Sequence, residues 1–170
     1  MSNYLIPLMV VVPMLCAILV NAFAKFNKSI KVLTFVVAIC LPIIPLLSNY
    51  GLHFFGGYTP MLDNATGVIY HPAITYAFDM LQQIFIVAVG LITFLVAFIY
   101  LSKYKKASGQ YLFLLFMGTA SVTALMLTDD IFNMFVFFEI LALVQVGIVI
   151  ASPMDYSYEM ALKYMILGSI

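Results

Sequence analysis

Long apolar segments constrain this chain more than any other feature. Five of them cover residues 4–23, 32–47, 80–101, 111–128 and 131–151, and a sixth, incomplete one covers 160–170. A transmembrane helix needs about 20 mostly apolar residues, because the hydrocarbon core of a bilayer is about 30 Å thick. We therefore predict an all-α integral membrane protein, a polytopic bundle of five or six transmembrane helices that form a single domain within the lipid bilayer.

The composition agrees with lipid as the solvent. Of the 170 residues, 65% are hydrophobic and 8% are charged, whereas a soluble domain carries roughly 25% charged residues. The net charge is zero and the sequence has no basic and aromatic run, so we expect no binding of nucleic acid. Cys16 and Cys40 each lie in an apolar run, which predicts neither a disulfide framework nor a metal site.

The lysines predict the orientation in the membrane. One cluster follows the first span and another follows the third, so both lie on the same side; they are Lys25, Lys28 and Lys31, and Lys103, Lys105 and Lys106. Positively charged loops face the cytoplasm. The N-terminus, the segment 49–76 and the connection through Asp129 and Asp130 are therefore predicted to lie outside.

The segment 49–76 is rich in Gly, Tyr, Pro and Asn, and we predict an extracytoplasmic loop or hairpin there, with two short strands around a turn near Asp63 and Asn64. Both histidines, His53 and His71, lie in this segment. Their position argues against a pair of axial haem ligands inside the bundle.

Prolines interrupt the second span. Pro42 and Pro45 lie toward its outer end, where they are predicted to kink or end the helix. Neighbouring helices can satisfy the carbonyls that such prolines leave without a donor.

Glu139 is the outstanding polar residue, because it lies near the middle of the fifth span, between Phe138 and Ile140. A carboxylate at that depth costs at least a few kcal/mol unless it is protonated, paired or hydrated, and such residues commonly mark ion or proton paths. The alternative is a neutral glutamate that makes one hydrogen bond between helices. We expect Glu139 to belong to a proton path.

Lys163 is the candidate partner of Glu139. It lies in the first turns of the sixth span, within an apolar stretch. Its side chain could instead extend to the cytoplasmic interface. The separation of Lys163 from Glu139 does not follow from the sequence.

Other polar residues are possible accessories to this path. Asp79 precedes the third span, and Asp129 and Asp130 precede the fifth, where acidic residues favour a helix N-terminus and can act simply as caps. Gln82, Gln83, Thr123 and Gln145 lie within or near spans, where polar groups relay protons or only join helices.

No nucleotide-binding, nucleophile or zinc motif is present in the sequence. We therefore expect no catalytic residue, cofactor or metal in this chain. If it belongs to a redox enzyme, electrons travel in another subunit.

Three stretches resemble the antiporter-like membrane subunits, the family that includes proton-pumping subunits of respiratory complex I, large subunits of Mrp-type cation/proton antiporters and subunits of energy-converting hydrogenases. Residues 129–147, DDIFNMFVFFEILALVQVG, resemble the fifth helix of that family. Residues 78–85, FDMLQQIF, and 161–169, ALKYMILGS, resemble the beginnings of its third and sixth helices.

The resemblance covers nearly the whole chain. It implies that Glu139 is the essential glutamate of the fifth helix and that Lys163 is the lysine of the sixth. Family members continue through further helices, including a broken seventh helix with another lysine and a broken twelfth, which this sequence lacks. A helix over 160–170 would rise only about 16 Å, so we expect an N-terminal fragment or the product of a split gene.

The leading prediction is thus a proton- or sodium-translocating subunit, in the cell membrane or the equivalent mitochondrial inner membrane. Its expected partners are other membrane subunits of a large complex, including the remainder of the antiporter-like fold. A non-conducting structural subunit that anchors partner proteins is the alternative. A quinone- or haem-binding subunit is a third possibility, against which the positions of the histidines argue.

Overall fold

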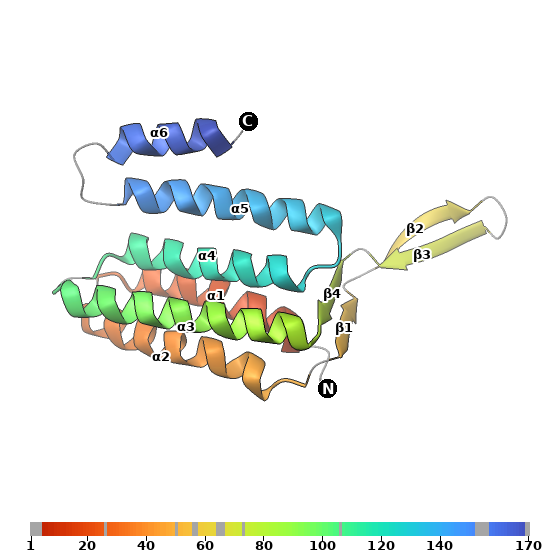
Figure 1. The fold of residues 1–170 in the computed structure, drawn as a ribbon, viewed down its shortest axis with the longest axis horizontal. Coiled ribbons are helices and arrows are strands. Elements are labelled where there is room, and N and C mark those ends of the chain that lie inside the picture. Colours follow the sequence, from red (N-terminus) through yellow and green to blue (C-terminus); the bar gives the residue numbers. More distant parts are fainter. Residues whose placement is uncertain are drawn as a thin grey trace.

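The computed structural model describes residues 5–25, 27–49, 51–55, 58–63, 67–72, 74–105, 107–151 and 157–168. Within these ranges it contains helices and short strands (Figure 1). The helices are α1 (Leu5–Ala22), α2 (Asn27–Leu47), α3 (Met80–Lys103), α4 (Gly109–Leu127), α5 (Ile131–Ile150) and α6 (Ser157–Gly168). Of these, α1 to α5 are long and apolar enough to cross a membrane. The predicted fold class is thus confirmed: the described structure is a nearly all-helical bundle with five candidate membrane-spanning helices.

The helices run up and down beside one another, with connections at alternating ends (Figure 1). Packing does not follow chain order, because α1 packs mainly on α4 and α2 mainly on α3. Next to α4 lies α5, and α6 packs on the far side of α5. Both α5 and α6 thus lie at one margin of the bundle.

The lysines gather at one end of the bundle, and the strands and N-terminus lie at the other (Figure 1). Lys106 lies outside the described residues. Helix α2 begins at Asn27, earlier than the predicted 32, so that Lys28 and Lys31 belong to its first turns. Lys31 Nζ donates a hydrogen bond to the carbonyl of Tyr104 at 3.1 Å, just after α3. A cation there is favourable because the C-terminus of a helix carries partial negative charge.

Four strands occupy the segment between α2 and α3. β2 (Tyr58–Asp63) pairs antiparallel with β3 (Gly67–Pro72), which is the predicted pair; Asn64 of the predicted turn lies outside the described residues. β1 (Leu52–Phe55) pairs with β4 (Thr75–Phe78) and was not predicted. Both strands are only four residues long, and the other strand pair separates them in the chain.

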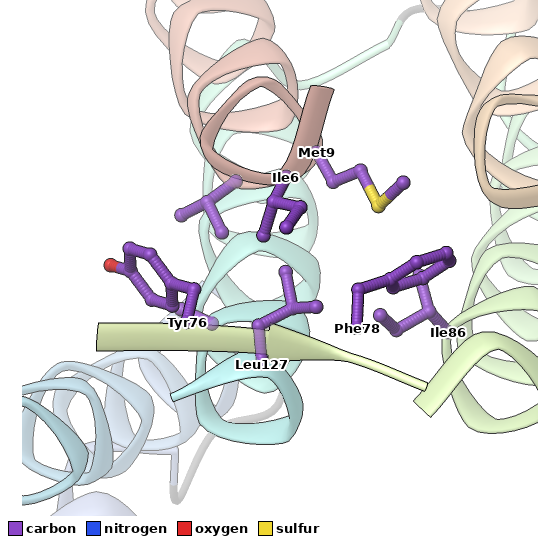
Figure 2. Packing of buried hydrophobic residues seen from close by; sticks show 8 residues of the cluster. Ile6, Met9, Tyr76, Phe78, Ile86 and Leu127 are labelled. Atoms are coloured by element: carbon purple, nitrogen blue, oxygen red, sulfur yellow. The ribbon is translucent and has the colours of Figure 1, made fainter. Parts of the chain in front are cut away.

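β4 closes the end of the bundle opposite to the lysine-bearing end. Its buried Tyr76 and Phe78 pack with Ile6 and Met9 of α1, and Ile86 of α3 and Leu127 of α4 complete this cluster (Figure 2). The backbone N–H of Asp129 donates to the carbonyl of Thr75 at 3.0 Å. The start of α5 is therefore tied to the same strand.

The prolines of α2 do not end that helix, which continues to Leu47. Gln83 of α3 donates from Nε2 to the carbonyl of Pro45 at 2.8 Å, and Ser48 Oγ donates to the carbonyl of Ile44 at 2.9 Å. These carbonyls lie in the last turn of α2, where they lack a donor within the helix. That neighbouring helices satisfy the carbonyls freed by the prolines stays a prediction.

Candidate functional site

Glu139 lies near the middle of α5, about 12 Å of helical rise from Ile131 and about 16 Å from Ile150. The buried residues of α5 are Asn133 and Val144, and Val144 contacts the position where a Cβ would stand on Gly118 of α4. Glu139 is exposed in the isolated chain. It therefore lies off the face by which α5 packs on α4.

A groove between α5 and α6 contains Glu139. Its volume is about 420 Å³, enough for several water molecules. The lining residues are Glu139, Ala142, Leu143, Gln145, Val146, Tyr164, Met165 and Gly168. Three of them are polar, namely a carboxyl group, an amide and a phenol, so the groove offers hydrogen-bonding partners to water at the depth of the bilayer core.

Gln145 is thus brought to the same groove as Glu139, whereas Tyr164 is a groove residue that the sequence analysis missed. The sequence alone gives no signal for Tyr164, because the packed face of α6 is known only from the structure. Ser157 and Ala161 are the buried residues of that helix, and Tyr164 follows Ala161 by three positions. Residues at this spacing share a helix face.

Lys163 pairs with Glu159 rather than with Glu139. Its Nζ lies 2.7 Å from Glu159 Oε1, one helical turn away, and the two side chains are 68% and 61% exposed. Lys163 is not among the residues that line the groove. Lys163 follows Ala161 by two positions, which turns it about 200° away from that buried residue. Its partnership with Glu139 stays a prediction. Exposed pairs of this kind contribute about 0.3–0.5 kcal/mol, so Lys163 is free to exchange partners.

The acidic residues at the strand-bearing end of the bundle lie at or beside helix termini. Asp130 is the N-cap of α5, and its carboxylate accepts from the N–H groups of Phe132 at 3.4 Å and Asn133 at 3.2 Å. Asp79 precedes α3, and its own N–H donates to Gln82 Oε1 at 3.1 Å. Asp129 is exposed at the same end. None of the three aspartates lines the Glu139 groove, and a role in an outer ion exit stays a prediction.

Replacing Asp130 by Ala tests its capping role. We expect a loss of about 1 kcal/mol in stability, because two N–H groups at the start of α5 lose their acceptor. The midpoint of thermal unfolding of the purified full-length protein measures this loss. Asp130→Asn is the matched control, since an asparagine oxygen also caps helices. Equal loss in both variants would assign the effect to charge instead.

Threonines join α3 to α4 in the interior. The hydroxyls of Thr93 and Thr119 lie 3.0 Å apart in a buried hydrogen bond. Thr123 donates to the carbonyl of Thr119 at 2.8 Å and lines a separate small cavity of about 10 Å³, room for about one water molecule. These hydrogen bonds and this cavity lie apart from the Glu139 groove. In this structure Thr123 therefore acts in helix packing.

Metal ligands do not cluster in the described part of the chain, where no group of three or more His, Cys, Asp or Glu side chains could hold an ion. Cys16 and Cys40 are free thiols, and His53 is exposed on β1.

Known proteins similar to this chain include a sequence relative and a solved structure. No family model matches the chain. An uncharacterized protein of Methanocaldococcus jannaschii, MJ1309, is 38% identical over 168 residues, which are 99% of this chain and 33% of that protein. A chain in the structure of the membrane-bound sulfane sulfur reductase, an archaeal respiratory membrane complex, matches 96% of this chain with a TM-score of 0.77 and 21% identity. This chain covers 34% of that one. The chain thus spans about a third of the length of each match, and it shares the fold of a chain in an archaeal respiratory membrane complex.

Proposed function

We propose that this chain is part of an antiporter-like membrane subunit that translocates protons or sodium ions within a multisubunit respiratory-type complex. That complex would be a complex I-like oxidoreductase, an energy-converting hydrogenase or an Mrp-type antiporter. The observation that carries the proposal is the position of Glu139, midway along α5 in a polar groove. The fold shared with a chain of the sulfane sulfur reductase complex supports it.

The groove supplies what an ion-exchanging carboxylate needs. An ionised carboxylate in hydrocarbon is costly, and water in a 420 Å³ groove lowers that cost. The amide of Gln145 donates hydrogen bonds, and the hydroxyl of Tyr164 both donates and accepts. Glu139 therefore takes up an ion from this water and releases it again.

Lys163 has an accessory role in the proposal. Its pair with Glu159 lies near the lysine-bearing end of the bundle. Because the pair is exposed and weak, Lys163 can turn toward another carboxylate when neighbouring helices bury it. A cation that moves toward or away from Glu139 would favour or oppose its ionised form.

Partners are proposed to cover α5 and α6. Both helices expose large apolar side chains, including Phe132, Phe135, Phe138, Leu162 and Met165. Other membrane subunits, further helices of a longer protein and lipid would meet these faces. The same exposed apolar surface suits the second candidate function, a non-conducting subunit that anchors partner proteins.

Ion transport in vesicles containing the whole complex decides between the two functions. Under the proposal, Glu139→Gln lowers transport about tenfold or more while the complex still assembles. Unchanged transport in an assembled complex would support the anchoring function, since the amide is similar in shape to the acid and would preserve packing.

A further inference from the structure

Two adjoining hollows lie at the lysine-bearing end of the bundle. One, of about 340 Å³, lies between α2 and α3, and the other, of about 460 Å³, is lined by α2 alone; they share Val32 and Val36. We call the two hollows together the α2–α3 groove. Its polar end is formed by Lys28, Ser29, Lys31 and Ser102, and its apolar part includes Val32, Phe35, Val36 and Phe98.

The polar and apolar parts follow the order of a phospholipid. Lys28 lies at the end of the bundle, and Val36 lies about 12 Å further along α2. A phospholipid in the membrane likewise places its charged headgroup at the surface and its acyl chains inward. We propose that the α2–α3 groove binds an anionic phospholipid, with its phosphate at Lys28 and an acyl chain along Val32, Val36 and Phe98.

Charge favours an anionic headgroup here. No acidic side chain lines the described groove. Lys31 is held in place, since its Nζ donates to the carbonyls of Tyr104 at 3.1 Å and Leu101 at 3.5 Å. Lys28 is exposed, and its ammonium group is available to a ligand. One fixed and one exposed cation therefore lie at the end predicted to face the cytoplasm, where anionic lipids give the leaflet a negative surface potential.

The apolar lining favours an acyl chain over another transmembrane helix. Val32, Val36 and Phe98 are 65%, 52% and 51% exposed. Helices in membranes approach each other closely at small residues, as this chain does where Gly90 lies against Pro42 and Gly147 against Leu114. The α2–α3 groove has bulky side chains instead. They leave a shallow depression that a flexible acyl chain can fill.

Native mass spectrometry of the intact complex tests the headgroup. The complex is reconstituted in phosphatidylcholine vesicles with a minor fraction of phosphatidylglycerol, then released in mild detergent, and the retained lipids are counted. We expect preferential retention of phosphatidylglycerol and a loss of about fivefold in Lys28→Gln, from the attraction of one lysine to an anionic leaflet. Lys25→Gln is the matched control, because Lys25 is also exposed but does not line the groove. If phosphatidylglycerol is not retained preferentially, or if Lys28→Gln and Lys25→Gln lose it equally, the proposed lipid site is wrong.

A photoreactive benzoyl-phenylalanine at Phe98 tests the acyl chain. The expected product carries the mass of phosphatidylglycerol and persists in an excess of soluble glycerol phosphate. A product with a protein subunit would show that another helix covers the groove. If glycerol phosphate prevents formation of the lipid product, the groove binds a phosphate at its surface and no acyl chain. Either result would contradict the proposal, and neither bears on ion transport through Glu139.

Discussion

Ion flux through vesicles containing the complex is expected to fall about tenfold or more in Glu139→Gln, a rise of about 1.4 kcal/mol or more in the barrier to ion transfer. The amide keeps the shape of the side chain and lacks a group that can exchange a proton or bind a cation by charge. Because Glu139 is exposed in the described chain and lines a groove, folding should be unaffected. Glu139→Asp, which keeps the carboxyl group on a shorter side chain, should retain part of the flux.

Glu159→Gln is the control for a change of charge. Glu159 also carries a carboxyl group, but it lies near the start of α6 and pairs with Lys163 on an exposed face. Its loss removes a weak pair, so flux should stay within about twofold of the native value. Equal losses in Glu139→Gln and Glu159→Gln would show that general surface charge, and not a carboxylate in the groove, controls transport.

Gly90→Ala is expected to have the largest effect on stability. A Cβ at Gly90 would stand 2.8 Å from the nitrogen and 2.9 Å from the Cα of Pro42. These are backbone atoms of α2 at a proline, so they cannot turn aside as a side chain would. Separating α2 from α3 to make room should cost about 1–3 kcal/mol, seen as a lower midpoint of thermal unfolding of the purified full-length protein.

Gly118→Ala is the matched control for Gly90→Ala. Its added Cβ would meet only one methyl group, Cγ1 of Val144, at 3.1 Å. That side chain can shift slightly, so the loss of stability should be clearly smaller than in Gly90→Ala. Similar losses in both variants would mean that the α2–α3 contact is no tighter than the α4–α5 contact.

Much of the fold follows from the sequence, because a bilayer imposes length and apolar composition on each helix. The predicted spans 80–101 and 131–151 match α3 (Met80–Lys103) and α5 (Ile131–Ile150) closely. Helix α2 was less well placed, since Lys28 and Lys31 were assigned to a loop. Long lysine side chains reach water from within a helix, so hydropathy alone shortens such an element.

Contacts between elements were harder to predict. β4 was missed because it is short and pairs with β1, from which β2 and β3 separate it in the chain. The packing of α1 on α4 depends on shape complementarity between distant segments, which periodicity does not reveal.

The candidate site was predicted in part. Glu139 was recognisable because an acidic residue inside an apolar span is rare, and Gln145 shares its groove. The partner of Lys163 was missed, although Glu159 lies four positions before it, a spacing that favours an ion pair on a helix. The local ion pair between Glu159 and Lys163 therefore competes with the long-range pair between Glu139 and Lys163, which charge alone suggests.

Infrared difference spectroscopy of the complex in vesicles tests the central claim most directly, because it observes the carboxyl group of Glu139 itself. An acid or sodium pulse that drives transport should change a carboxyl band, and that change should be absent in Glu139→Gln and present in Glu159→Gln. If every carboxyl band that responds to the pulse persists in Glu139→Gln, then Glu139 does not exchange an ion, and the account of this groove is wrong.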